Sequence, residues 1–241
     1  MKKVTSAVLL ALQLTGKIAA LIFLLTGVTQ VFFLFQELMP GGVPLQTTFG
    51  FESIVRSTLQ GSGMWWMLML AIFVGFRTAA SKGSKTVYTM NRLGLSELQI
   101  TLVFGLVFTG FFLLYWAFQL AVAYGAFVWY SRFTLVSSNT FMLACWRSEW
   151  LHTLLPLNEW WGWLRNLAIC TSFGFFAAYS GTYSRHGKFP AAGALPAILA
   201  FFLHGGQIGE PLPDLLLTAL MIGLTIGYYF SLKEALKDED F

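Results

Sequence analysis

Residues 82–99 of the 241-residue chain, KGSKTVYTMNRLGLSELQ, form a basic, polar segment between two long apolar runs. Ser84 can cap the start of a short helix by accepting a hydrogen bond from a backbone N–H group. Gly94 can end that helix, because glycine adopts a left-handed conformation at little steric cost. The segment therefore predicts a short helix, a stop and a new helix start.

The predicted short helix carries one apolar stripe, formed by Val87, Met90 and Leu93. Immediately after its end, Ser96 and Gln99 have the spacing of a capping box, which predicts that a second helix begins there. A short amphipathic helix joined rigidly to a long apolar helix can work as a lever, with its stripe docked in a groove of a partner. The alternative is an ordinary surface helix in a loop.

The composition places most of the chain in lipid. Hydrophobic residues make up 56% of the sequence and charged residues only 11%, whereas soluble domains contain about 25% charged residues. A core of this size cannot hide so much apolar surface from water. The net charge of +4 comes from basic residues in short loops between apolar runs, which indicates membrane topology rather than nucleic-acid binding.

A helix that crosses a bilayer needs about 20 mainly apolar residues. Six spans are predicted, at residues 17–35, 63–76, within 99–130, 167–181, 190–203 and 214–232. The third run, about 48 Å long as a helix, is either one long span or two spans with a tight turn. One long helix leaves only Arg56, Arg132, Arg147 and Arg165 on the side opposite the other basic residues. The positive-inside rule therefore favours one helix, with both termini cytoplasmic.

Three further segments are predicted to be interfacial or irregular. Residues 6–16 suit an amphipathic helix that lies on the membrane surface before the first span. Residues 131–163 mix tryptophan with charge, which is typical of a helix at the headgroup level. Residues 204–213, HGGQIGEPLP, hold too many helix breakers for a straight crossing and predict a re-entrant turn. The chain is thus expected to be one all-α transmembrane domain, residues 1–241.

Two stretches resemble a known family. The segment GSKTVYTMNRLGLSELQ, followed by a long aromatic-rich helix, resembles the first cytoplasmic loop of ABC-2-type transporter permease subunits. The segment RSEWLHTLLPLNEWWGWLRNL is similar to a subset of short bacterial permeases of that class. The resemblance covers most of the chain in topology, but only these two stretches in residues.

The resemblance implies that residues 86–92 form a coupling helix that docks on an ATPase subunit. The implied partner-binding residues are Lys85, Thr86, Val87, Tyr88, Thr89, Met90, Asn91 and Arg92. The resemblance also implies an N-terminal interfacial helix, matched by residues 6–16, and an irregular segment between spans five and six, matched by residues 204–213. The long outer segment 131–163 departs from the commonest family pattern and leaves the substrate class open.

The resemblance further implies a homo- or heterodimer of permease subunits with two ATPase chains, in a bacterial plasma membrane. The sequence contains no G-x-x-x-x-G-K-[ST] motif, so ATP and Mg²⁺ are expected in the partner. This chain is therefore expected to be no enzyme and to hold no cofactor or metal.

Polar residues within the predicted spans are few. Gln119 lies in the middle of the third span, either as a pathway residue or, as we favour, as an interhelical hydrogen-bonding group. His204 and Glu210, in the re-entrant segment, are candidate pathway residues or plain loop residues. Gly223 and Gly227 form a G-x-x-x-G motif, which predicts close helix packing, with dimerisation of the subunit as the alternative.

No charged residue lies in the middle of a predicted span. This argues against ion coupling and favours an apolar or amphipathic cargo moved by an external energy source.

Two other functional classes stay open. An intramembrane enzyme needs a nucleophile and a base at membrane depth, whereas Ser184 and His186 fall in a basic loop and the aspartates lie at the ends of predicted spans. A membrane-embedded solute-binding subunit would not need the lever at residues 82–99.

Overall fold

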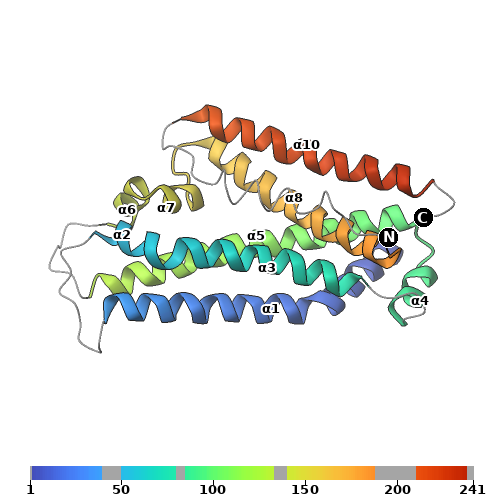
Figure 1. Cartoon of the computed structure of the whole chain (residues 1–241), viewed down its shortest axis with the longest axis horizontal. Coiled ribbons are helices and arrows are strands. Elements are labelled where there is room, and N and C mark those ends of the chain that lie inside the picture. Colours follow the sequence, from blue (N-terminus) through green and yellow to red (C-terminus); the bar gives the residue numbers. More distant parts are fainter. Residues whose placement is uncertain (1, 40–49, 80–84, 133–139, 188–209, 238–241) are drawn as a thin grey trace.

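The computed structural model describes residues 2–39, 50–79, 85–132, 140–187 and 210–237, and every element in these ranges is a helix. The long helices are α1 (Lys2–Leu38), α3 (Gly61–Thr78), α5 (Glu97–Tyr130), α8 (Trp160–Arg185) and α10 (Pro211–Ala235). The short elements are α2 (Phe51–Val55), the π-helical turn η2 (Arg56–Gln60), α4 (Lys85–Arg92), α6 (Phe141–Arg147) and α7 (Glu149–Leu154). The long helices form a bundle with α4 at one end and α2, α6 and α7 towards the other (Figure 1).

Within the described ranges, four helical segments are long and apolar enough to cross a membrane. They are Lys3–Leu38, Phe51–Thr78 (which joins α2, η2 and α3), Glu97–Tyr130 and Pro211–Ala235. The run that could have been one span or two is a single helix of 34 residues, as the distribution of basic residues predicted. The predicted fifth span, residues 190–203, lies outside the described residues.

The stop and restart predicted after residue 93 are confirmed. Gly94 has a φ of +60°, the left-handed conformation that glycine adopts at low cost. Ser96 Oγ accepts from the Gln99 backbone N–H at 3.3 Å, and Gln99 Oε1 accepts from the Ser96 N–H at 3.1 Å. The capping box leaves four residues, 93–96, between α4 and α5. Ser84, the predicted cap of α4, lies outside the described residues.

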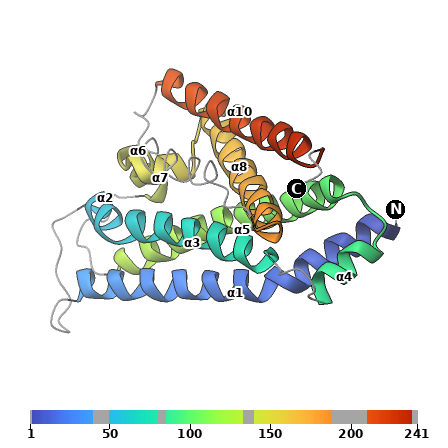
Figure 2. The same cartoon turned by 45° about the vertical axis from the view of Figure 1, so that its right-hand side comes forward.

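Residues 6–16, expected to lie on the membrane surface, are the N-terminal part of α1, which is continuous over 37 residues. No proline or left-handed residue interrupts it, and Lys17 is exposed on its surface. Such a helix is about 55 Å long and exceeds a hydrocarbon core of about 30 Å. Figure 2 shows its N-terminal part inclined to the remainder and lying beside α4.

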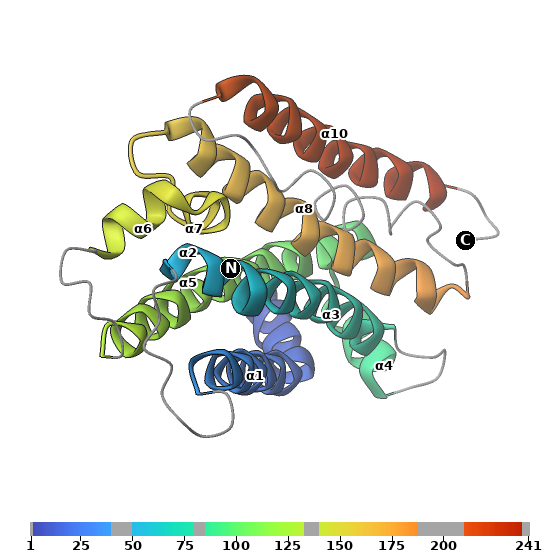
Figure 3. The ribbon, with the colours of Figure 1, turned by 60° about the vertical axis from the view of Figure 1, so that its left-hand side comes forward.

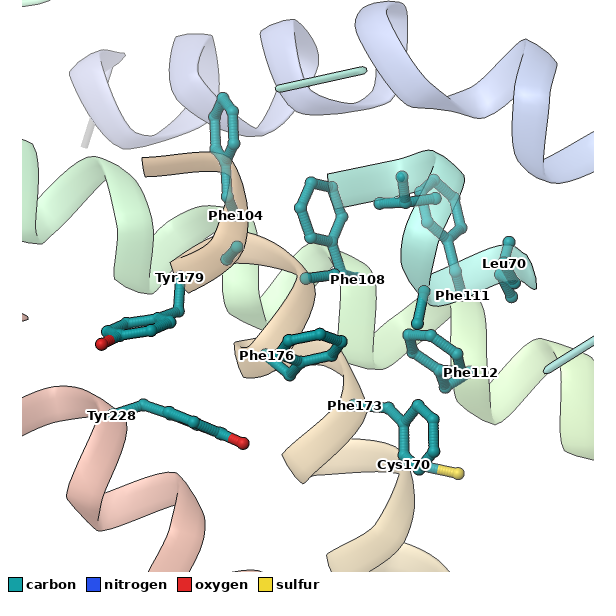
Figure 4. Packing of buried hydrophobic residues seen from close by; sticks show 14 of the residues in the cluster. Leu70, Phe104, Phe108, Phe111, Phe112, Cys170, Phe173, Phe176, Tyr179 and Tyr228 are labelled. Atoms are coloured by element: carbon teal, nitrogen blue, oxygen red, sulfur yellow. The ribbon is translucent and has the colours of Figure 1, made fainter. Parts of the chain in front are cut away.

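α8 is the central helix of the bundle. It packs against α3, α5 and α10, and Figure 3 shows it between α10 and the layer of α3 and α5. Its contacts with α5 are aromatic, as between Phe112 and Phe173, whose ring centroids lie 5.5 Å apart (Figure 4). α8 contains the predicted fourth span, residues 167–181. It is rich in glycine, alanine and serine and is therefore less apolar than the four segments that are apolar enough to cross a membrane.

The packing predicted for the G-x-x-x-G motif of the last helix is wrong for the described part of the chain. A Cβ atom at Gly223 or Gly227 would have no described neighbour within 4 Å. α10 instead meets α8 through its opposite face, which carries the buried residues Leu217, Met221 and Tyr228.

α8 and α10 run in the same direction. Arg165 near the start of α8 bonds Asp214 near the start of α10, and Tyr179 near the end of α8 bonds Ser231 near the end of α10. Gly187 and Glu210, the described residues on either side of residues 188–209, therefore lie at opposite ends of the bundle.

The topology can be tested with matched cysteine variants. Arg77, in the last turn of α3, and Arg132, just after α5, are both exposed and lie at opposite ends of the bundle. In a chain with Cys145 and Cys170 replaced by alanine, we expect a membrane-impermeant maleimide to label Arg132→Cys in intact cells. Arg77→Cys should be labelled only in inverted vesicles. Labelling of both from one side would contradict a single crossing by α5.

Candidate functional site

α4 lies outside the ends of the long helices, beside the N-terminal part of α1 (Figures 1 and 2). Its exposed side chains include Tyr88, Thr89 and Arg92, and the Arg92 guanidinium carbon lies 5.0 Å from the centroid of the Tyr88 ring. This is the geometry of a cation–π contact. A flat, exposed pair of an arginine and a tyrosine is the composition that binding hot spots favour.

The expected docking stripe of α4 included Met90, but Met90 is buried within the chain. Its side chain is only 3% exposed and belongs to the same apolar core as Ala11 of α1 and Ile100 of α5. Met90 therefore attaches α4 to its own chain and is not available to a partner in this structure. The other predicted coupling residues, Lys85, Thr86, Val87 and Asn91, lie on the same helix.

A partly buried ionic cluster joins the start of α5 to the ends of α3 and α8. Glu97, in the first turn of α5, lies with Oε1 3.1 Å from Arg185 Nη2 and with Oε2 3.0 Å from His186 Nε2. Arg185 also donates to the carbonyl of Thr78, the last residue of α3, at 3.2 Å. Burial lowers the pKa of Arg185 from its usual value, and the Glu97 carboxylate opposes that shift.

One further contact joins α5 and α8 a turn deeper, where the hydroxyls of Thr101 and Thr182 lie 2.8 Å apart. On the other side of the junction, Lys3 Nζ donates to the Gly94 carbonyl at 3.3 Å. Glu97 occupies the first turn of α5, where the helix dipole favours negative charge, but nothing in the sequence marks Arg185 as its partner. A displacement of α4 would therefore be transmitted to the start of α5, where α5 is held to α8 and α8 is held to α3.

A second candidate site is an apolar pocket between α3, α5, α7 and α8. Its volume is about 80 Å³. Its lining residues are Gly63, Met64, Met67, Leu68, Phe112, Tyr115, Trp116, Gln119, Trp150, Leu154, Asn166, Ile169, Cys170 and Phe173.

Gln119 links the pocket to the first helix. Gln30 Nε2 of α1 donates to Gln119 Oε1 at 2.7 Å and lies 3.4 Å from the carbonyl of Leu59 in η2. A Cβ atom at Gly63 would lie only 2.8 Å from Gln119 Oε1, so the glycine leaves room for this amide pair. Gln119 is thus both an interhelical hydrogen-bonding group, as favoured from the sequence, and a pocket residue.

A polar layer covers the pocket at the end away from α4. Arg165 Nη1 lies 2.6 Å from Asp214 Oδ1, and Arg165 Nη2 donates to the carbonyl of Thr153 at 3.1 Å. Asn166 Nδ2 donates to the same carbonyl at 2.7 Å. Glu159 and Glu149 are closer to Arg165 in the sequence and are the obvious candidate partners. The structure pairs it with Asp214, because α10 runs parallel to α8.

A second buried pair lies in the same layer. His152 Nε2 of α7 is 3.0 Å from Glu159 Oε2, although the two groups are not aligned for a hydrogen bond.

α6 and α7 have seven and six residues and are far too short to span a bilayer. The outer segment predicted as one headgroup-level helix is therefore two short helices packed against the bundle.

The remaining predicted site residues do not join either site. Glu210 is exposed immediately before α10 and does not line the pocket, and His204 lies outside the described residues. Residues 211–213 of the expected re-entrant turn form the first turn of α10. Pro211 suits this position because a first-turn residue needs no backbone N–H for the helix.

Comparison with family models, with curated proteins and with solved structures finds no match to this chain.

Proposed function

We propose that the chain is the membrane-spanning subunit of an ATP-driven (ABC) transporter of the ABC-2 permease type, coupled to a separate ATPase. The observation that carries this proposal is the position of α4. It lies outside the ends of the long helices, four residues from the 34-residue helix α5, and the start of α5 is joined to α8 by the Glu97–Arg185 contact. A partner that displaced α4 would displace α5 and α8 with it.

The proposed topology has six spans. α8 is counted as the fourth, because Arg165 and Arg185 are twenty residues, or about 30 Å, apart on it, which equals the hydrocarbon thickness. No charged residue lies between them. The parallel course of α8 and α10 supports a return crossing between Gly187 and Glu210, as the six-span topology requires.

The α4 end of the bundle is proposed to be cytoplasmic. Lys3, Arg77, Arg92, Arg185 and Lys233 lie at this end, and basic residues mark the cytoplasmic side of membrane proteins. The proposed location is a bacterial plasma membrane, with a second permease subunit as the other partner. The uncharged pocket supports a neutral apolar or amphipathic cargo, moved by export or import.

The pocket also favours a second candidate function, a membrane-embedded solute-binding subunit. Such a protein would hold its ligand in the pocket, and no ATPase would need to contact α4. The coupling experiment below separates the two functions.

The proposal predicts that Arg92→Glu uncouples the chain from its ATPase. Reversing the charge of a central interface arginine typically costs 2 kcal/mol or more, or about 30-fold in affinity. We expect stimulation of the ATPase by the reconstituted permease to require about 30-fold more permease. The measurement is the ATPase rate in liposomes, titrated with wild-type and variant permease.

Arg77→Glu is the matched control, because Arg77 is exposed at the same end of the bundle and undergoes the same change of charge. Its titration should be close to that of the wild type. An Arg92→Glu variant that stimulates normally, or an equal loss in both variants, would count against docking through α4.

A further inference from the structure

The pocket contains polar groups that are almost all used within the chain. The Tyr115 hydroxyl donates to the carbonyl of Gly63 at 2.8 Å, and Trp116 Nε1 donates to the carbonyl of Leu154 at 2.8 Å. Asn166 donates to the carbonyl of Thr153, and its Oδ1 accepts from Arg165 Nε at 3.3 Å. These groups fix the walls of the pocket and are not free to bind a ligand.

Gln119 is the exception. Its side chain is only 3% exposed, its Oε1 accepts from Gln30, and its Nε2 has no hydrogen-bond partner among the described residues. A buried donor without an acceptor costs free energy, and native structures keep few of them. The orientation of the Gln119 amide follows from its contact with Gln30. Gln30 Nε2 is a donor that lies near two oxygens, the Leu59 carbonyl and Gln119 Oε1, so Gln119 turns its oxygen towards Gln30 and its Nε2 away.

We propose that the pocket binds a neutral, mainly apolar small molecule whose carbonyl or hydroxyl oxygen accepts a hydrogen bond from Gln119 Nε2. None of the lining residues is charged, so a charged ligand would lose its hydration without compensation. Met64 and Met67 give one wall a flexible, polarizable surface, which adapts to ligands of different shape. The aromatic rings of Phe112 and Phe173 add flat apolar area to the lining.

The depth of the pocket agrees with a lipid-soluble ligand. Ile169, Cys170 and Phe173 line it, four to eight residues after Arg165 on α8. At 1.5 Å per residue this is about 6–12 Å below the polar layer. The pocket therefore lies at the depth of acyl chains, where an amphiphile places its first apolar carbons.

This inference deepens the proposed function by naming the class of cargo, and as a cargo assignment it rests on that function. The binding itself does not require an ATPase. The chain alone can therefore show no ligand binding in the pocket while α4 still couples to the ATPase. It can equally bind the ligand while α4 does not couple to an ATPase.

The test is photolabelling of the full chain in lipid nanodiscs with a diazirine-bearing octanol. Mass spectrometry should find the label on pocket residues such as Met64, Met67 or Cys170. Competition is then measured with 1-decanol, 2-decanone and decane at equal concentrations in the membrane. One hydrogen bond corresponds to about a fivefold difference in affinity. We therefore expect the alcohol and the ketone to compete at about fivefold lower concentration than the alkane.

Gln119→Leu should abolish this preference and bring the ratio to about one, while decane still competes, which shows that the pocket is intact. Gln13→Leu, at an exposed glutamine of α1, is the matched control and should keep the ratio. The proposal is overturned if the label avoids the pocket. It is also overturned if the wild type shows no preference, because water or the nearby Tyr115 hydroxyl then satisfies the donor, or if the preference survives in Gln119→Leu.

Discussion

Asp214→Leu should lower the free energy of unfolding by about 3–5 kcal/mol, the cost of leaving one partner of a buried ion pair alone. The side chains of Arg165 and Asp214 are only 5% and 8% exposed. Without the carboxylate, the guanidinium keeps only neutral acceptors, the carbonyl of Thr153 and Oδ1 of Asn166. The measurement is unfolding of the detergent-solubilised protein by titration with a denaturing detergent.

The double variant Arg165→Leu, Asp214→Leu should recover most of this loss, because no buried charge is then left without a partner. Glu52→Gln serves as the control, since Glu52 meets Arg147 at 3.8 Å with the arginine side chain 57% exposed. Such a surface pair contributes about 0–1 kcal/mol. If Asp214→Leu cost no more than Glu52→Gln, the Arg165–Asp214 contact could not be a desolvated pair that joins α8 to α10.

Gly174→Leu should separate α5 from α8 and destabilise the bundle by at least about 3 kcal/mol. A Cβ atom at Gly174 would overlap the backbone nitrogen and the hydroxyl of Thr109, and it would lie 2.8 Å from the Cα of Thr109. A flexible side chain can move aside, but the backbone of α5 can yield only by moving the whole helix. We expect a large loss of folded protein after membrane extraction, measured by size-exclusion chromatography and thermal unfolding.

Gly110→Leu is the matched control, because a Cβ atom there meets nothing described within 4 Å. It makes the same substitution on the partner helix and should change stability by less than about 0.5 kcal/mol. Equal stability of the two variants would contradict the close crossing of α5 and α8.

Local signals were sufficient to predict the turn between α4 and α5. The stop at Gly94 and the capping box at Ser96 and Gln99 involve residues a few positions apart, so their geometry is encoded in their spacing. That residues 97–130 form one helix and not two was predictable from the distribution of basic residues, which depends on membrane topology and not on packing.

Long-range pairings were not predictable from the sequence in the same way. Arg165 and Asp214 are 49 positions apart and meet only because α8 and α10 run parallel. Met90 is buried because it packs in a core that also contains residues of α1 and α5. The spacing of apolar residues along α4 predicts an apolar stripe, but it does not show which surface covers that stripe. The G-x-x-x-G motif of α10 has no neighbour among the described residues, since small residues mark a face that permits close packing without fixing its partner.

One hydrogen bond beside the pocket was predictable from the sequence. A glutamine in the middle of a span predicts a hydrogen bond to another helix, and Gln119 makes one to Gln30. The methionine and phenylalanine residues around it look the same in sequence as side chains that face lipid. Their convergence depends on the crossing of α3, α5 and α8, and this is a tertiary property.

The central claim, that α4 contacts an ATPase, is tested most directly by a photoreactive amino acid at position 88. Tyr88 is 61% exposed on α4, and Phe76, 66% exposed near the end of α3, is the control position. After irradiation of native membranes, we predict a crosslink from position 88 to an ATP-binding subunit identified by mass spectrometry, and none from position 76. A position 88 that crosslinks only to lipid or to a second copy of this chain would contradict the account.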